Sequence, residues 1–139
     1  MKNTLLLNEI REMLHDGQYD EIKLFVESNP PHVVANFLEA LKINEIVKIF
    51  SFIDEEIAAE VYAAFEDDVK NLLTKELSSR ELAELLYELP DSMHSQILST
   101  FSEEEKEKIR KLIREVDSEE QMKQAEQFAH IPGIIRDSD

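Results

Sequence analysis

Runs of acidic residues are the side chains in this sequence that are best suited to chemistry. They form three clusters, Asp54-Glu55-Glu56, Glu66-Asp67-Asp68 and Glu103-Glu104-Glu105. Carboxylates of this kind can bind hard cations such as Mg²⁺, directly or through water. Each cluster also falls at an expected helix start, where an acidic residue stabilises the helix by about 0.3–1 kcal/mol. Because no calcium-loop pattern of alternating acids around a central glycine occurs, the clusters indicate helix starts and, at most, weak, shared or interfacial cations.

Other residue types offer no catalytic arrangement. None of the four histidines stands at a zinc-ligand spacing from another histidine or an acid. The chain has no cysteine and only two glycines, Gly17 and Gly133, so it has neither thiolate chemistry nor a phosphate-binding glycine loop. No Gly-x-Ser-x-Gly motif is present. The sequence therefore predicts a protein that is not an enzyme.

The net charge limits the partners. With 31 acidic and 15 basic residues the formal charge is −16, which disfavours binding to nucleic acid and to anionic membrane surfaces. The aliphatic run Leu5–Leu7 is too short for a membrane span or a signal peptide. We expect a cytoplasmic chain with no direct membrane insertion, which could still be the soluble part of a larger membrane protein.

The elements that carry these residues repeat every twelve positions. Scarce glycine and proline, with abundant Glu, Leu, Ala and Lys, favour an all-α fold. Within each unit the apolar residues stand at i, i+3, i+4 and i+7, which marks one face of a helix. One apolar series runs Phe25, Phe37, Ile49, Val61, Leu73, Leu85, Ile97, Ile109, and a second runs Leu41, Ile53, Phe65, Leu77, Leu89, Phe101, Ile113.

The unit boundaries carry helix-start residues. Proline, aspartate or serine follows the last apolar residue of several units, and Ser78 with Glu81 and Ser102 with Glu105 have capping-box spacing. Each unit is therefore a helix of roughly nine residues and a tight turn. Such short helices are stable only when stacked, so the sequence predicts an α-solenoid, a superhelical stack of short antiparallel helices.

The repeat also predicts a domain organisation. We expect an N-terminal capping helix in 1–17 that ends at Gly17, a helical-repeat solenoid in 18–116, a separate C-terminal helix in 117–130 and a flexible tail or linker in 131–139. Polar residues that interrupt an apolar series, such as His94, are interpreted as local packing exceptions. In a solenoid, turns at every second junction share an edge, so 54–56, 78–81 and 102–105 are expected on one edge, and 66–68 and 90–91 on the other.

Four stretches of the sequence resemble the cytoplasmic N domain of MgtE magnesium transporters: Pro31–Leu41, Ile53–Val61, Leu77–Leu89 and the opening His15–Ile22. The resemblance spans about residues 9–115. It implies a superhelical helix stack followed by CBS domains and a transmembrane pore. It also implies that Mg²⁺ bridges acidic surfaces of the N and CBS domains and favours the closed channel.

The same resemblance implies two metal ligands. Glu60 matches a position at which the family places a cation-facing glutamate. The family's acid-rich motif corresponds here to Leu89–Gln96, in which Asp91 is the one acidic residue, so Asp91 is the second expected Mg²⁺ ligand.

Two functions follow as hypotheses. The first is a regulatory domain that senses Mg²⁺ through acidic surface residues and controls transport through contacts with CBS and transmembrane domains. The alternative is a protein–protein adaptor with a FliG-like helical scaffold, which grips a partner without metal. A homodimer is compatible with both hypotheses.

Overall fold

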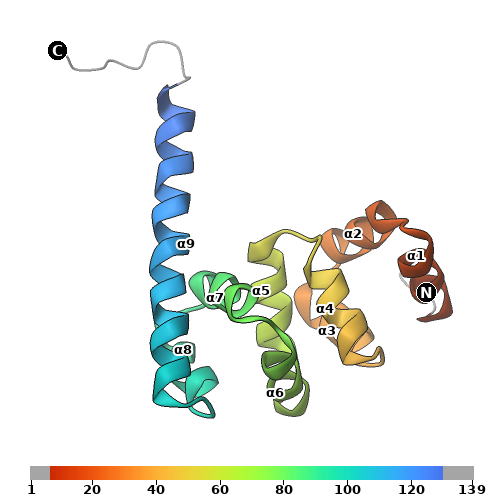
Figure 1. Cartoon of the computed structure of the whole chain (residues 1–139). Coiled ribbons are helices and arrows are strands. Elements are labelled where there is room, and N and C mark those ends of the chain that lie inside the picture. Colours follow the sequence, from red (N-terminus) through yellow and green to blue (C-terminus); the bar gives the residue numbers. More distant parts are fainter. Residues whose placement is uncertain (1–6, 130–139) are drawn as a thin grey trace.

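The fold consists of short helices that begin every twelve residues. A computed structural model describes residues 7–129 of the chain, with side chains as far as Gln127. Within this range all regular structure is helical (Figure 1), in agreement with the predicted all-α class. The helices are α1 (Leu7–Asp16), α2 (Tyr19–Ser28), α3 (Pro31–Leu38), α4 (Ile43–Phe50), α5 (Glu55–Ala64), α6 (Asp67–Glu76), α7 (Ser79–Glu88), α8 (Asp91–Leu98) and α9 (Glu103–Ala129).

Local hydrogen bonds fix the helix starts. The Ser78 hydroxyl accepts from the Glu81 amide at 3.1 Å, and the Glu81 carboxylate accepts from the Ser78 amide at 2.8 Å. The same reciprocal pair joins Ser102 and Glu105, and the Asp54 carboxylate accepts from the Glu56 amide at 2.8 Å. Each pair satisfies amide groups that have no partner inside the helix. The predicted caps are confirmed, and so is the twelve-residue unit.

Alternate helices pack side by side in two layers. Helix α3 packs on α5, α5 on α7 and α7 on α9, while α4 packs on α6. Figure 1 shows the resulting row of helices from α1 at one end to α9 at the other. Because each helix contacts mainly its nearest equivalents, the arrangement is the predicted α-solenoid.

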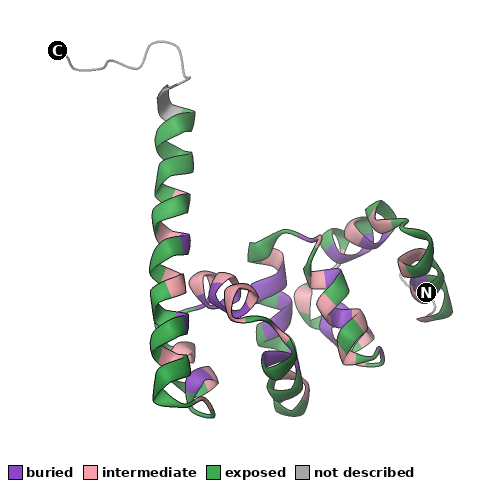
Figure 2. Ribbon diagram, viewed as in Figure 1, coloured by how far each residue is buried: buried purple, intermediate pink, exposed green. Residues whose placement is uncertain are grey.

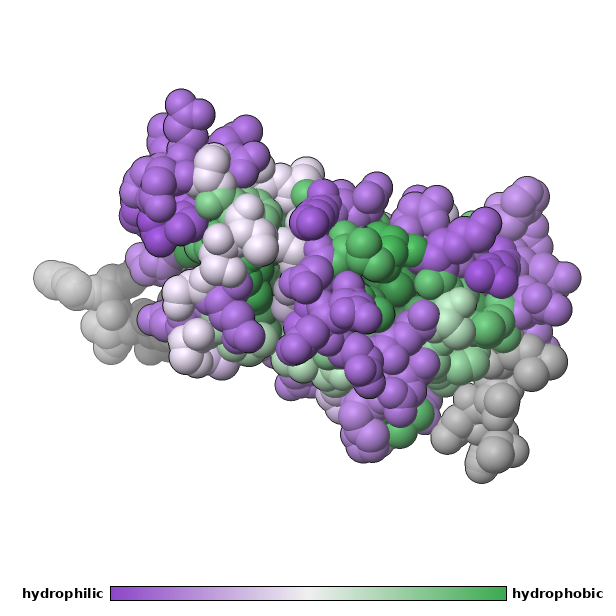
Figure 3. Space-filling view, turned by 90° about the horizontal axis from the view of Figure 1, so that it is seen from below, coloured by the Kyte–Doolittle hydropathy of each residue, from purple (hydrophilic) through white to green (hydrophobic). Residues whose placement is uncertain are grey.

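The core runs between the layers as a continuous line of apolar side chains. Members of both twelve-residue series lie in it, including Ile49, Val61, Leu73 and Leu89. Figure 2 shows buried residues on the inner sides of the helices. On the face shown in Figure 3, hydrophobic residues reach the surface only in patches between hydrophilic ones.

Two polar residues inside the apolar series have specific partners. The Thr74 hydroxyl donates to the Lys70 carbonyl at 2.7 Å and therefore accepts from the Tyr62 hydroxyl, 2.8 Å away. His94 Nε2 lies 2.6 Å from the Leu86 carbonyl and 3.2 Å from the Leu89 carbonyl, so it donates to the end of α7. The interpretation of His94 as a packing exception is confirmed, because the partly buried ring is held by backbone carbonyls at the end of α7.

The end of the chain differs from the predicted organisation. The sequence predicts a separate helix in 117–130, but α9 runs without a break from Glu103 to Ala129, over 27 residues. No glycine or proline occurs between Ser102 and Pro132, so nothing in the sequence forces the helix to stop. The apolar period ends near Val116 because the neighbouring layer ends there, and α9 extends past the other helices (Figure 1).

Two apolar residues of α9 beyond Val116 are not packed against other helices. Met122 is 65% exposed, and Ala125 is also exposed. At the other end, α1 stops at Gly17, whose φ of +76° is a conformation that favours glycine, as predicted. Residues 1–6 of the expected capping helix and the expected tail 131–139 lie outside the described residues.

Candidate functional site

Acidic residues from three helices meet where α5, α7 and α9 come together. Glu55 is the first residue of α5, Glu84 and Glu88 lie on α7, and Glu120 lies on α9. We call these four residues the acidic corner. Burial raises the pKa of the Glu55 carboxyl, and the nearby charges of Glu84 and Glu120 raise it further. Burial likewise raises the pKa of Glu88, followed by the charges of Glu56, Glu55 and Glu120. The carboxylates of the corner therefore repel one another across helices.

Basic and aromatic side chains hold α9 against α7 at this corner. Arg80 Nε donates to the Glu84 carboxylate at 2.9 Å, and Arg80 Nη2 donates to the Glu119 carboxylate at 2.6 Å. The Tyr87 hydroxyl donates to the Asp117 carboxylate at 3.1 Å. The bonds to Glu119 and Asp117 connect α7 to the part of α9 that lies beyond Val116, while the bond to Glu84 lies within α7.

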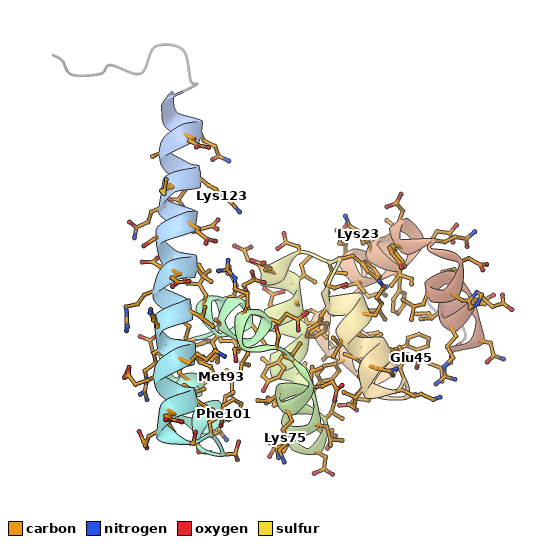
Figure 4. All side chains as sticks on the ribbon, viewed as in Figure 1. Lys23, Glu45, Lys75, Met93, Phe101 and Lys123 are labelled. Carbon is orange, nitrogen blue, oxygen red and sulfur yellow. The ribbon has the colours of Figure 1, made fainter. Side chains whose placement is uncertain are left out.

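Lys123 is the cation that α9 supplies to Glu55. Its positive charge partly opposes the rise in the pKa of Glu55. In Figure 4 the Lys123 side chain extends from α9 on the side that faces the remaining helices. The pKa of Glu55 nevertheless stays raised, so Lys123 only partly offsets burial and the charges of the neighbouring carboxylates.

Glu60 lies in a shallow depression between α5 and the end of α7. The depression has a volume of about 340 Å³ and is lined by Glu56, Glu60 and Glu88, together with Ala59, Ala63, Leu89 and Pro90. Glu60 itself is exposed. The structure thus places the sequence-predicted Glu60 beside Glu88, a member of the acidic corner.

Asp91 lies next to this depression without lining it. It follows Pro90, which forms part of the wall, and its carboxylate is fully exposed and 4.0 Å from His94 Nδ1. Within the part of the chain that the structure describes, no three His, Asp or Glu side chains converge closely enough to hold a metal ion. The arrangement offers dispersed carboxylates to a hydrated cation rather than a closed coordination sphere.

The sequence pattern identified the acids at the helix starts but not Glu84, Glu88 and Glu120, which lie farther along α7 and α9. Glu84 stands 24 residues after Glu60, at the same position of the next helix in the layer, and this spacing could have identified it. Glu120 could not be placed, because the sequence predicted a boundary before it. The expected shared edge of 54–56 and 78–81 is supported, since Glu55 and Glu81 line one groove.

Repulsion at the acidic corner predicts a pH-dependent gain in stability for Glu88→Gln. Since the folded chain raises the pKa of Glu88 above its usual 4.5, the folded state binds its proton more tightly, and stability falls as the pH rises through the folded pKa. We expect Glu88→Gln to be more stable than the original chain at pH 7 by about 0.2–0.5 kcal/mol, the size of a surface like-charge effect. The difference should vanish below pH 4.5.

Urea unfolding at pH 4 and pH 7 measures this effect. Glu12→Gln is the matched control, because it removes one negative charge from an exposed position in the middle of α1, away from the corner and from any helix start. An equal gain in the free energy of unfolding for the two variants at pH 7 would contradict local repulsion at Glu88. It would mean that the gain comes only from the lower net charge.

Comparison with known proteins gives the family. The model of the MgtE intracellular N domain matches residues 18–130. Searches of curated proteins and of solved structures each found no match. Among the described residues, no helix combines the length and the apolar character that crossing a membrane requires. The matched region contains the whole of the acidic corner and both predicted ligands, Glu60 and Asp91, and the chain belongs to the MgtE intracellular N domain family, whose members are intracellular domains of magnesium transporters.

Proposed function

We propose that this chain is a cytoplasmic regulatory domain of an MgtE-type magnesium transporter and that it senses Mg²⁺ through the acidic surface of α5 and α7. The observation that carries the proposal is the depression shared by Glu60, Glu56 and Glu88, which lies inside the region matched by the family. The family is regulatory rather than catalytic, which agrees with a non-enzymatic role.

The physical basis is the repulsion between unneutralised carboxylates. A Mg²⁺ ion keeps most of its water and binds proteins through one or two carboxylates. An open group of glutamates can therefore bind a hydrated Mg²⁺ ion, whereas an ion that loses its water needs a closed set of protein ligands. Glu60 would be the first ligand, and Asp91, beside the same depression, would be the second. The rest of the ion's coordination would come from water and from acidic groups of a neighbouring domain.

Regulation would follow from the contact between domains. Acidic surfaces separate when bare and approach when cations lie between them, so the Mg²⁺ concentration would set the population of the closed arrangement. The neighbours in this proposal are the CBS and transmembrane domains of the same transporter. The adaptor alternative requires no ion at Glu60.

The proposal predicts that Mg²⁺ stabilises the chain specifically. At ten times its dissociation constant a bound ion adds about 1.4 kcal/mol, which is a rise of roughly 4 °C in the thermal midpoint. The measurement compares midpoints in MgCl₂ and NaCl at equal ionic strength. Glu60→Gln should abolish most of the Mg²⁺-specific rise.

Glu12→Gln is the matched control, because Glu12 is an exposed glutamate in the middle of α1, away from the depression. This variant should keep the full rise. Equal midpoints in the two salts for the original chain, or an equal loss in both variants, would contradict binding at Glu60.

A further inference from the structure

A second concave feature, separate from the depression at Glu60, lies between two junctions of the solenoid. It is a groove of about 180 Å³ formed by the end of α4, the start of α5, the α6–α7 junction and the middle of α7. Its lining is largely apolar. The partly buried side chains of Val47, Phe50 and Leu77 form the walls, and the buried side chains of Ile53, Ala58 and Leu85 form the floor.

The walls are held in place by the core. Phe50 stacks on Phe65 with ring centroids 6.2 Å apart and an interplanar angle of 15°, and Phe65 is buried. Leu85 and Ala58 belong to the continuous core. The groove is therefore preformed, which lowers the entropy cost of binding an apolar group in it.

Every charged side chain that lines this groove is negative: Glu55, Glu81 and Glu84. Two of the three already have local contacts, since Glu81 accepts the Ser78 amide and Glu84 accepts from Arg80. Glu55 instead faces Glu84 and Glu120, with Lys123 as the opposing charge. Burial raises its pKa, and the charges of Glu84 and Glu120 raise it further. A cation supplied beside Glu55 would relieve this repulsion.

We propose that this groove is a docking site for a basic amphipathic helix of a partner protein, which places one apolar side chain between Phe50 and Leu77 and a Lys or Arg beside Glu55. The groove is smaller than the 300–1,000 Å³ typical of small-molecule sites and matches a side-chain anchor instead. An apolar anchor and a cation one turn apart on a helix match the adjacent apolar floor and acidic rim. The proposal is independent of Mg²⁺ binding at Glu60.

Charge complementarity selects a basic partner over a second copy of this chain. Each copy carries a net charge of −16, so two copies repel as they approach. A basic helix is attracted by the whole domain and is oriented by the acidic rim.

The test uses the full chain and a fluorescein-labelled synthetic helix with leucine on one face and lysine on the other. The control peptide is the same helix with glutamate in place of lysine. Fluorescence anisotropy should show saturable binding of the lysine peptide and none of the glutamate peptide. Glu55→Lys and Leu77→Ala should each weaken binding roughly tenfold, because one removes the rim charge and the other removes an apolar wall.

Asp67→Lys is the matched control for Glu55→Lys, since both residues are exposed first residues of ten-residue helices and Asp67 starts the next helix, α6. It should weaken binding less than about twofold, an effect of net charge alone. Glu60→Gln should leave peptide affinity unchanged, which separates this proposal from the Mg²⁺ proposal. Circular dichroism establishes that each variant is folded.

Three results would overturn the assignment. The first is that the lysine peptide fails to bind the original chain. The second is that Asp67→Lys weakens peptide binding as much as Glu55→Lys does, which would mean that the peptide is attracted to the net charge and not to the groove. Concentration-dependent sedimentation of the original chain that Glu55→Lys abolishes would assign the groove to a second copy instead.

Discussion

Replacing Leu82 by alanine lowers the free energy of unfolding by about 2–5 kcal/mol. Leu82 is fully buried in α7, and α7 is the helix that packs against both α5 and α9. The substitution leaves a cavity in the hydrophobic core to which Leu82 belongs. Because each solenoid unit is stabilised by its neighbours, the loss should affect both sides of α7. Urea unfolding followed by circular dichroism measures it.

The control for this prediction is an equal truncation at the surface. Leu24 on α2 is 64% exposed, so Leu24→Ala should change stability by less than about 0.5 kcal/mol. Similar losses for Leu82→Ala and Leu24→Ala would contradict the packing of α7 between α5 and α9.

Replacing Ser118 by proline destabilises the chain by about 3 kcal/mol, because proline inside a helix removes a hydrogen bond and clashes with the preceding turn. Ser118 is an exposed residue in the interior of α9, so the cost comes from the backbone alone. The break would also detach Glu119 and Glu120 from their places beside Arg80 and the acidic corner. Far-UV circular dichroism and the urea midpoint measure the loss, with Ser118→Ala as the control.

This substitution distinguishes the two accounts of the C-terminal region. If a separate helix began near 118, as the apolar pattern alone predicts, proline would stand in its first turn and be tolerated. Equal helicity and stability of Ser118→Pro and Ser118→Ala would therefore contradict a continuous α9.

Much of the fold was predictable because the same local chemistry recurs in every unit. The caps at Asp54, Ser78 and Ser102 and the apolar series define both the helix starts and the buried face. These are short-range features, and the sequence shows them directly. The continuous α9 was not predictable from the apolar period. The period shows which residues pack against neighbouring helices, but it does not show where a helix ends.

The candidate site was predictable only in part. The resemblance supplied Glu60 and Asp91, and the structure places Glu60 in an acidic depression and Asp91 at its border. Glu84, Glu88 and Glu120 come together through packing between α5, α7 and α9, which no local pattern records. The groove at Phe50 and Leu77 has the same origin, since its walls come from successive junctions of the stack.

We propose above that Mg²⁺ binds at Glu60 on the surface between α5 and α7. The most direct measurement uses Mn²⁺, which prefers the same oxygen ligands as Mg²⁺, and records paramagnetic broadening of backbone amide signals in the ¹⁵N-labelled chain. If Mg²⁺ binds there, broadening should be centred on residues 56–60 and 88–91, excess Mg²⁺ should reverse it, and Glu60→Gln should remove it. Broadening spread evenly over the acidic helix starts, including 66–68 and 103–105, would contradict binding at Glu60.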